Sequence, residues 1–133
     1  ETRPRSRYSH TASVVGSDIV IAFGYFFDHW DGGRATWLPD VWALRKAPDT
    51  ESDDDPEPLA WRLVWHAASS HSASPPLRMN HVAVSRFTSS KLVIFGGSGV
   101  DGAKMNDIWQ LDFEAGEWEL LSDGRGAGVA PSS

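Results

Sequence analysis

The chain has 133 residues, no cysteine, and 18 acidic against 12 basic residues, for a formal net charge of −6. Without cysteine, the sequence holds no disulfide and no thiolate metal site. Six acidic residues fall within residues 49–57 and the remaining charges balance, so no basic cluster is present that could bind nucleic-acid phosphates.

The first half of the chain, residues 1–65, is predicted to form one four-stranded unit. It opens with a connecting segment at residues 1–6. The apolar run IVIAFG at 19–24 is rich in β-branched residues, too short for a helix, and closed by glycine, which is typical of a buried strand. The four strands are expected at residues 7–15, 19–24, 41–44 and 61–65.

Two long loops interrupt this first unit. Residues 25–39 hold five aromatic residues within thirteen positions, and apolar surface of this size is buried either on the chain itself or on a partner. Residues 45–60 carry the acidic run and three prolines, which favours a solvated loop. Calcium binding is the alternative, but the run lacks the alternating Asp spacing and distal Glu of a calcium loop.

The second half repeats this organisation with shorter loops. Residues 66–77 form a Ser/Ala/Pro-rich connector, residues 78–121 a second four-stranded unit, and residues 122–133 a further connector. The run KLVIFGG at 91–97 is the buried strand of this unit. Its four strands are expected near residues 79–86, 91–96, 107–112 and 118–121.

Landmarks recur in the same order in both units. The offset between matching landmarks falls from 71 to 57 residues along the chain, so the first unit carries two insertions, one before Asp40 and one after Trp42. The matched segments are RYSHTA at 7–12 with RMNHVA at 78–83, Phe23-Gly24 with Phe95-Gly96, DVWAL at 40–44 with DIWQL at 107–111, and WRL at 61–63 with WEL at 118–120.

These landmarks resemble the kelch motif: Arg-x-x-His, an apolar run ending in Gly-Gly, Asn-Asp-Ile-Trp-x-Leu-Asp, and a lone Trp. The second unit matches throughout, whereas in the first Tyr25 takes the place of the second glycine and Pro39 that of the asparagine. The resemblance covers nearly the whole chain. It implies an all-β fold, two four-stranded antiparallel blades of a kelch-type β-propeller.

Two blades are fewer than the roughly 4–8 of closed propellers, so the chain is expected to be incomplete on its own. Its expected partners are further blades of the same or another chain, or a protein bound by the propeller. No apolar run of 18 residues is present, and a membrane partner is not expected. The compartment is unknown, with the cytoplasm or nucleus weakly favoured by the lack of a secretion pattern.

No cofactor, metal or catalytic residue is predicted. The run GSGVDG at 97–102 has the glycine spacing of a dinucleotide loop, but a strand rather than a helix follows it. His66 and His71 share a segment without a third ligand nearby. An enzyme role is uncertain and less favoured, because no nucleophile elbow or zinc-helix motif occurs.

The expected function is protein–protein interaction, with a shared active site or a purely architectural role as alternatives. The resemblance implies that Arg7 and Arg78 open the innermost strands at the channel mouth and grip acidic groups of a partner, unless each pairs with a neighbouring blade's carboxylate. The loops at 25–39 and 98–106 are expected on that same face, and residues 49–57 on the opposite one. The candidate binding residues are Arg7, Arg78, Tyr25, Phe26, Phe27, Trp30 and Trp37. The candidate structural residues are His10, His81, Gly24, Gly96, Gly97, Trp42, Trp109, Trp61 and Trp118, with Trp42 and Trp109 expected to wedge between blades.

Overall fold

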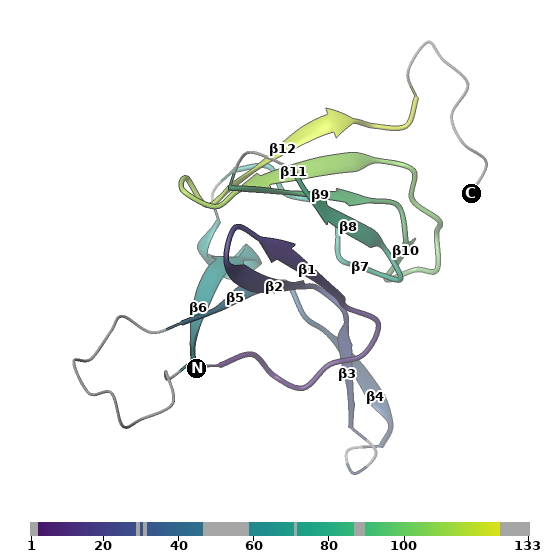
Figure 1. Cartoon of the computed structure of the whole chain (residues 1–133). Helices are drawn as coiled ribbons and strands as arrows, with labels where there is room; N and C mark the ends of the chain where they lie inside the picture. The colour runs from purple at the N-terminus through teal and green to yellow at the C-terminus, as the bar shows by residue number, and fades with distance from the viewer. Residues whose placement is uncertain are drawn as a thin grey trace.

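The computed structural model describes residues 3–28, 30, 32–46, 59–70, 72–86 and 90–125. In these ranges two four-stranded antiparallel sheets lie one against the other (Figure 1). Blade 1 has the strand order β1 (Thr11–Val15), β2 (Asp18–Ala22), β5 (Asp40–Lys46), β6 (Leu59–His66), and blade 2 the order β8 (Val82–Ser85), β9 (Lys91–Phe95), β11 (Ile108–Asp112), β12 (Glu117–Ser122). This confirms the predicted fold class.

The core lies between the two blades, because alternate residues of each central strand point into it. Blade 1 contributes its trailing face, which we define by Val20, Ala22, Val41, Ala43 and Trp65. Blade 2 contributes its leading face, defined by Leu92, Ile94, Trp109, Leu111 and Trp118. The registers Val20↔Ala43 and Leu92↔Leu111 place these residues opposite one another on one side of each sheet.

Aromatic rings join the two blades at this core. The ring of Phe23 stacks on that of Trp118 with centroids 5.8 Å apart and meets Trp65 edge-on at 6.0 Å. Trp65 and Trp118 themselves form an edge-to-face pair at 5.9 Å. Such pairs stabilise by about 0.5–1.5 kcal/mol beyond the area they bury.

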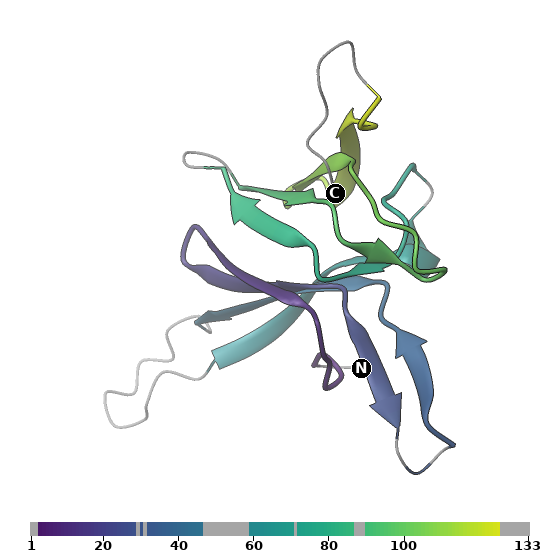
Figure 2. The ribbon, with the colours of Figure 1, turned by 90° about the vertical axis from the view of Figure 1, so that its right-hand side faces the viewer.

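Residues 25–39, predicted as a loop, form a second structural element. β3 (Tyr25–Asp28) and β4 (Arg34–Trp37) pair as a two-stranded hairpin, which projects from blade 1 away from blade 2 (Figure 2). The prediction of a loop was therefore wrong at this place. A smaller pairing joins β7 (Arg78–Met79) to β10 (Ser98–Gly99), and a 3-10 turn, η1 (Ala67–Ser69), lies in the connector.

The first strand of each blade begins later than the predicted residues 7 and 79. Ser9 and Asn80 have φ of +56°, a left-handed conformation that interrupts an extended strand. β1 therefore starts at Thr11 and β8 at Val82. Arg7 and Arg78 precede these bends.

The structure also corrects the predicted alignment of the glycines. Gly24 and Gly97 both have φ of +94°, and a Cβ on either would lie 2.5 or 2.6 Å from the carbonyl oxygen of Tyr8 or Met79. Gly24 is therefore the counterpart of Gly97 and not of Gly96. The residue that takes the place of Gly96 is Phe23, whose φ of +56° matches the +69° of that glycine, and Tyr25 replaces neither glycine.

Candidate binding surface

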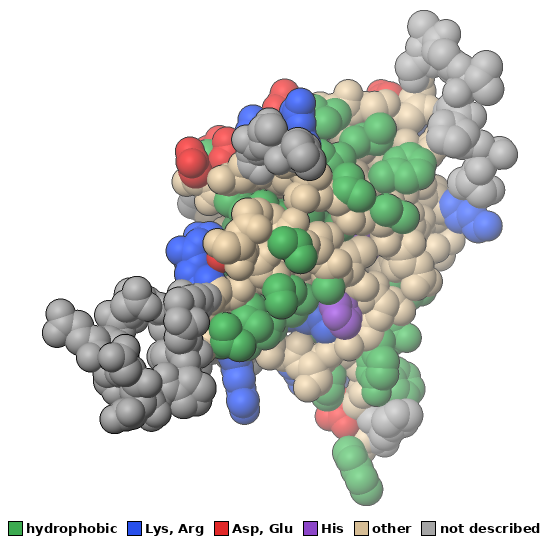
Figure 3. Space-filling model, in the orientation of Figure 1, with side chains coloured by type: hydrophobic (Ala, Val, Ile, Leu, Met, Phe, Trp, Pro, Cys, Tyr) green, Lys and Arg blue, Asp and Glu red, His purple; other side chains and the backbone are tan. Residues whose placement is uncertain are grey.

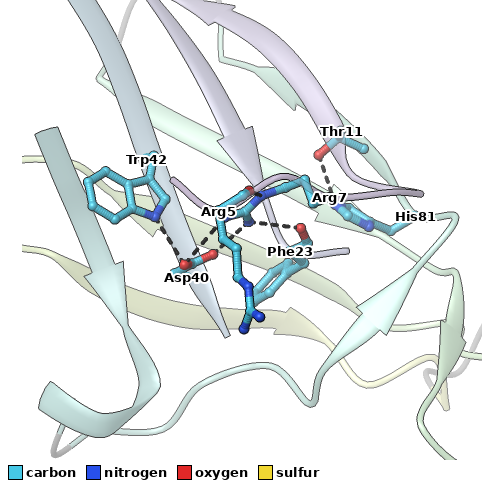
Figure 4. Close-up of polar contacts among 7 residues, drawn as sticks. All are labelled: Arg5, Arg7, Thr11, Phe23, Asp40, Trp42 and His81. Carbon is cyan, nitrogen blue, oxygen red and sulfur yellow. Dashed lines mark hydrogen bonds and ion pairs between the residues drawn. The ribbon is translucent and has the colours of Figure 1, made fainter. Parts of the chain in front are cut away.

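Arg7 is clamped inside blade 1. Its Nη1 donates to Asp40 Oδ1 at 2.6 Å and to the carbonyl oxygen of Phe23 at 3.1 Å, while Asp40 Oδ2 accepts from Trp42 Nε1 at 3.0 Å (Figure 4). The Arg7 side chain is only 2% exposed. Because residues 23 and 40 flank the hairpin insertion, this arginine fixes both roots of the hairpin.

Blade 2 repeats the arrangement with Arg78. Its guanidinium donates to both carboxylate oxygens of Asp107 at 2.7 and 2.8 Å and to the carbonyl oxygen of Gly96 at 2.9 Å, and Trp109 Nε1 donates to Asp107 Oδ2 at 2.8 Å. The Arg78 side chain is 0% exposed. Burial acts to raise the pKa of Asp107, but hydrogen bonds from Arg78 and Trp109 outweigh it and hold the pKa below its usual value.

These contacts place both arginines within their own blades. The sequence offered two roles, contact with a partner or pairing with a neighbouring blade's carboxylate. The structure pairs each guanidinium with an aspartate of the same blade, Asp40 or Asp107. Neither side chain lies at a surface of this chain.

The tryptophans predicted to be structural differ in burial and in what they pack against. Trp42, Trp109 and Trp118 are buried and Trp61 is half-buried. Trp109 lies on the leading face of blade 2, against blade 1. Trp42 lies between Val41 and Ala43 in the strand and so points to the opposite face of blade 1, away from blade 2. It thus holds in blade 1 the position that Trp109 holds in blade 2, opposite Ile21 as Trp109 is opposite Ile94, but on the face of blade 1 that no described blade of this chain covers.

The two histidines of the repeated motif differ in burial. His81 is buried between the blades, where its Nε2 lies 2.8 Å from Thr11 Oγ1. Burial, with smaller effects from the charges of Arg78 and His10, lowers the pKa of His81 to about 4. His10 is exposed in this chain, and partial burial together with Arg7 lowers its pKa as well.

His81 makes the stability of the fold pH-dependent. The unfolded chain binds a proton near pH 6.5 and the folded chain only near pH 4, so the contribution of His81 is complete above pH 6.5 and is lost as the pH falls toward 4. We expect the free energy of unfolding to drop by about 2 kcal/mol over this interval. Urea titrations at about pH 7 and pH 4.5 measure it. In the variant His81→Gln the drop should be clearly smaller, and an equal drop would assign the effect to other groups.

Two aromatic rings of the hairpin and one from the segment before β1 form a row that we call the aromatic strip, defined as Tyr8, Tyr25 and Trp37. The ring centroids of Tyr8 and Tyr25 are 5.8 Å apart and those of Tyr25 and Trp37 6.1 Å apart. Tyr25 and Trp37 are directly opposite in the register of β3 and β4, so they share one face of the hairpin. Tyr8 is exposed and the other two rings are half-buried.

The other predicted aromatic residues lie along the same hairpin. On its second face the guanidinium of Arg5 lies 4.1 Å from the centroid of Phe26, a cation–π contact. The Phe27 ring lies over Gly33, since a Cβ added to this glycine would lie 3.2 Å from the ring. Trp30, in the turn between the strands, is 98% exposed.

Backbone bonds fix the root of the hairpin. Tyr8 and Tyr25 exchange both N–H···O bonds, at 2.7 and 3.0 Å, and the amide of Leu38 donates to the carbonyl of Gly24 at 3.0 Å. Sequence reasoning missed Tyr8 and Arg5 as members of this surface. The signal for Tyr8 was its place directly after Arg7, next to the strand that the loop follows.

The ends of the strands in blade 1 relate to the prediction that residues 25–39 and residues 49–57 lie on opposite faces. In antiparallel blade 1 the hairpin leaves from the end of β2 and returns at the start of β5, the same end as residues 7–10. Lys46 and Leu59, which flank the acidic run, are at the other end of β5 and β6. Residues 49–57, His29 and His71 lie outside the described residues.

The chain is similar to parts of several longer proteins. No family model matches the chain. It is 29% identical over 122 residues to an F-box/kelch-repeat protein of Arabidopsis thaliana, 28% over 134 residues to human Host cell factor 1, and 35% over 109 residues to Tip elongation aberrant protein 1 of Schizosaccharomyces pombe. These alignments cover 89%, 96% and 80% of this chain but only 22%, 6% and 8% of the relatives.

A solved structure supports the fold. That of YjhT, a kelch propeller, matches 91% of this chain with a TM-score of 0.51 and 20% identity, and 29% of its own length is covered. Among the described residues, no helix is long and apolar enough to span a membrane, and no group of three or more His, Cys, Asp or Glu side chains is placed to hold a metal ion.

Proposed function

Because the chain belongs to the kelch-repeat family, we propose that it is part of a protein-binding propeller and contacts its partner through the hairpin β3–β4. The observation that carries the proposal is the aromatic strip, three rings in series of which Tyr25 and Trp37 lie on one face of the hairpin that projects from blade 1 (Figure 2). Tyr8 is 52% exposed and Trp30 98% exposed in the described chain.

The chemistry of the strip suits protein recognition. Tyr and Trp are enriched among residues that dominate binding energy, because they bury a large area with few rotatable bonds. The hairpin is held at both roots by Arg7 and by the Tyr8–Tyr25 bonds, so little conformational entropy is lost when a partner binds. In this proposal Arg7 and Arg78 position loops at the binding end and do not touch the partner themselves.

Site-specific crosslinking in the full-length protein tests the proposal. A photoreactive amino acid in place of Trp30 should capture the binding partner in cells, and the same amino acid in place of Glu117, at the opposite end of blade 2, should not. With the captured partner purified, we expect Trp37→Ala to weaken binding about 30-fold, which corresponds to about 2 kcal/mol.

The matched control is Glu117→Ala, which should leave the affinity within about two-fold. The circular dichroism spectrum of each variant establishes that it folds. A folded Trp37→Ala protein that binds as tightly as the unchanged one would show that the partner lies elsewhere, and so would equal crosslinking from positions 30 and 117.

A further inference from the structure

The contact between the two blades contains a short ladder of polar links between first strands. β1 and β8 lie side by side. Thr11 Oγ1 pairs with His81 Nε2 at 2.8 Å, and Ser13 Oγ donates to the carbonyl oxygen of Ala83 at 3.1 Å. The amide of Asn80 donates to the carbonyl of Ser9 at 3.3 Å. The hydroxyl-bearing strand β1 of one blade thus faces β8 of the next and the histidine that precedes it.

The repeat offset of 71 residues shows what the two free faces of the chain offer in the same places. The leading face of blade 1, the side of its sheet that carries Trp42, presents His10 where blade 2 presents His81, and the carbonyl of Ala12 where blade 2 presents that of Ala83. The trailing face of blade 2, the side of its sheet opposite to Trp109, presents Val82 and Val84 where blade 1 presents Thr11 and Ser13. The leading face of blade 1 therefore has the histidine and the carbonyl that accept hydrogen bonds in the ladder, whereas the trailing face of blade 2 has valines in place of the hydroxyls that donate them.

We infer that the leading face of blade 1 binds a β-blade whose first strand carries Ser or Thr hydroxyls at the positions of Thr11 and Ser13, with His10 as the residue that recognises them. A second copy of this chain is not that partner. In a head-to-tail contact between copies, His10 would meet Val82, and Ala12 would meet Val84. Neither valine can donate a hydrogen bond.

The free face itself supports a blade-sized partner. Val14, Ile19 and Leu63 are exposed on it, and Figure 3 shows hydrophobic side chains at the surface over both blades. Apolar area of this kind supplies affinity without much selectivity, since any apolar sheet can cover it. Selectivity comes from the histidine, because an imidazole buried against a valine loses its hydrogen bonds to water and gains none.

The protonation state of His10 also suits a hydroxyl partner. Partial burial, with a smaller effect from the positive charge of Arg7, lowers the pKa of His10 and so favours the uncharged ring, which offers one nitrogen as acceptor. A hydroxyl is a donor that suits this nitrogen, as Thr11 suits His81 within the chain. A carboxylate, which only accepts, does not suit the lone pair.

A double-mutant cycle on the 133-residue chain tests the inference. The variant Val82→Thr/Val84→Ser supplies the missing hydroxyls from a second copy, and His10→Leu removes the acceptor while keeping an apolar side chain. Association constants of the four chains are measured by sedimentation equilibrium. We expect His10→Leu to strengthen association of the original chain and to weaken that of the hydroxyl variant, with a coupling of about ten-fold between the two positions.

The circular dichroism spectrum is the control that all four chains fold. Equal effects of His10→Leu in both backgrounds, within about two-fold, would overturn the inference. It would also be overturned if the hydroxyl variant showed no association at all, or if the original chain formed an oligomer that depends on His10 as strongly as the hydroxyl variant does.

Discussion

Replacing Asp107 with alanine should destabilise the chain by about 3–5 kcal/mol, the cost of leaving a buried charge without its partner. Arg78 is 0% exposed and receives its compensation from Asp107 and the carbonyl of Gly96. The substitution also leaves the indole N–H of Trp109 without its acceptor. Urea denaturation followed by tryptophan fluorescence measures the loss, at one fixed protein concentration because association of open faces adds to apparent stability.

Asp18 provides a matched control. It too bonds an arginine, with Arg45 Nη2 2.8 Å from its Oδ2, but the Arg45 side chain is 47% exposed. After Asp18→Ala water hydrates that guanidinium, so the cost should stay near 1 kcal/mol or below. Adding Arg78→Met to Asp107→Ala removes the orphaned charge and should restore part of the stability. If Asp107→Ala lowers the free energy of unfolding no more than Asp18→Ala does, Asp107 does not compensate a buried charge on Arg78.

The architecture was predictable because the chain repeats itself. Two runs of buried-strand composition, each followed by glycine and an Asp-x-Trp segment, predict the four strands of each blade, but not the extra pairs β3–β4 and β7–β10. Strand starts were less accurate. Nothing in the residue types of Ser9 marks a left-handed bend, although Asn80 at the matching position tolerates one.

The hairpin could have been predicted from local signals. Residues 25–28 and 34–37 are rich in aromatic and β-branched residues, and two glycines lie between them, the pattern of two strands and a turn. The aspartate partner of each arginine could not be chosen in the same way. Asp40 and Asp107 stood in recognised landmarks, but pairing within a blade or between blades depends on how the sheets twist and stack, which spacing does not encode.

The wrong alignment of Gly24 with Gly96 has a physical cause at the preceding residue, Phe23. Phe23 occupies a left-handed position that blade 2 fills with Gly96, and a side chain there costs about 1–2 kcal/mol. The Phe23 ring offsets this cost, because it is fully buried among Trp65, Trp118 and His81. A large apolar residue at a glycine position resembles the last residue of the buried strand. The alignment by residue type therefore paired Gly24 with Gly96, one position before its true counterpart Gly97.

Removing the Phe23 ring should cost about 3–5 kcal/mol in Phe23→Ala, as for other buried phenylalanines. Phe23→Gly loses the same ring but relieves the backbone, so it should be less destabilised than Phe23→Ala by about 1 kcal/mol. At an ordinary strand position the order is reversed, because glycine weakens a strand by about 0.5–1 kcal/mol relative to alanine.

Val20 is the matched control for this reversal. It is buried in the middle of β2 and has no left-handed conformation, so Val20→Gly should be less stable than Val20→Ala. Urea midpoints of the four variants at one concentration decide the question. Should Phe23→Gly prove less stable than Phe23→Ala, as Val20→Gly is expected to be relative to Val20→Ala, the backbone at residue 23 is not strained. Phe23 would then not stand in the place of the first glycine of the repeat.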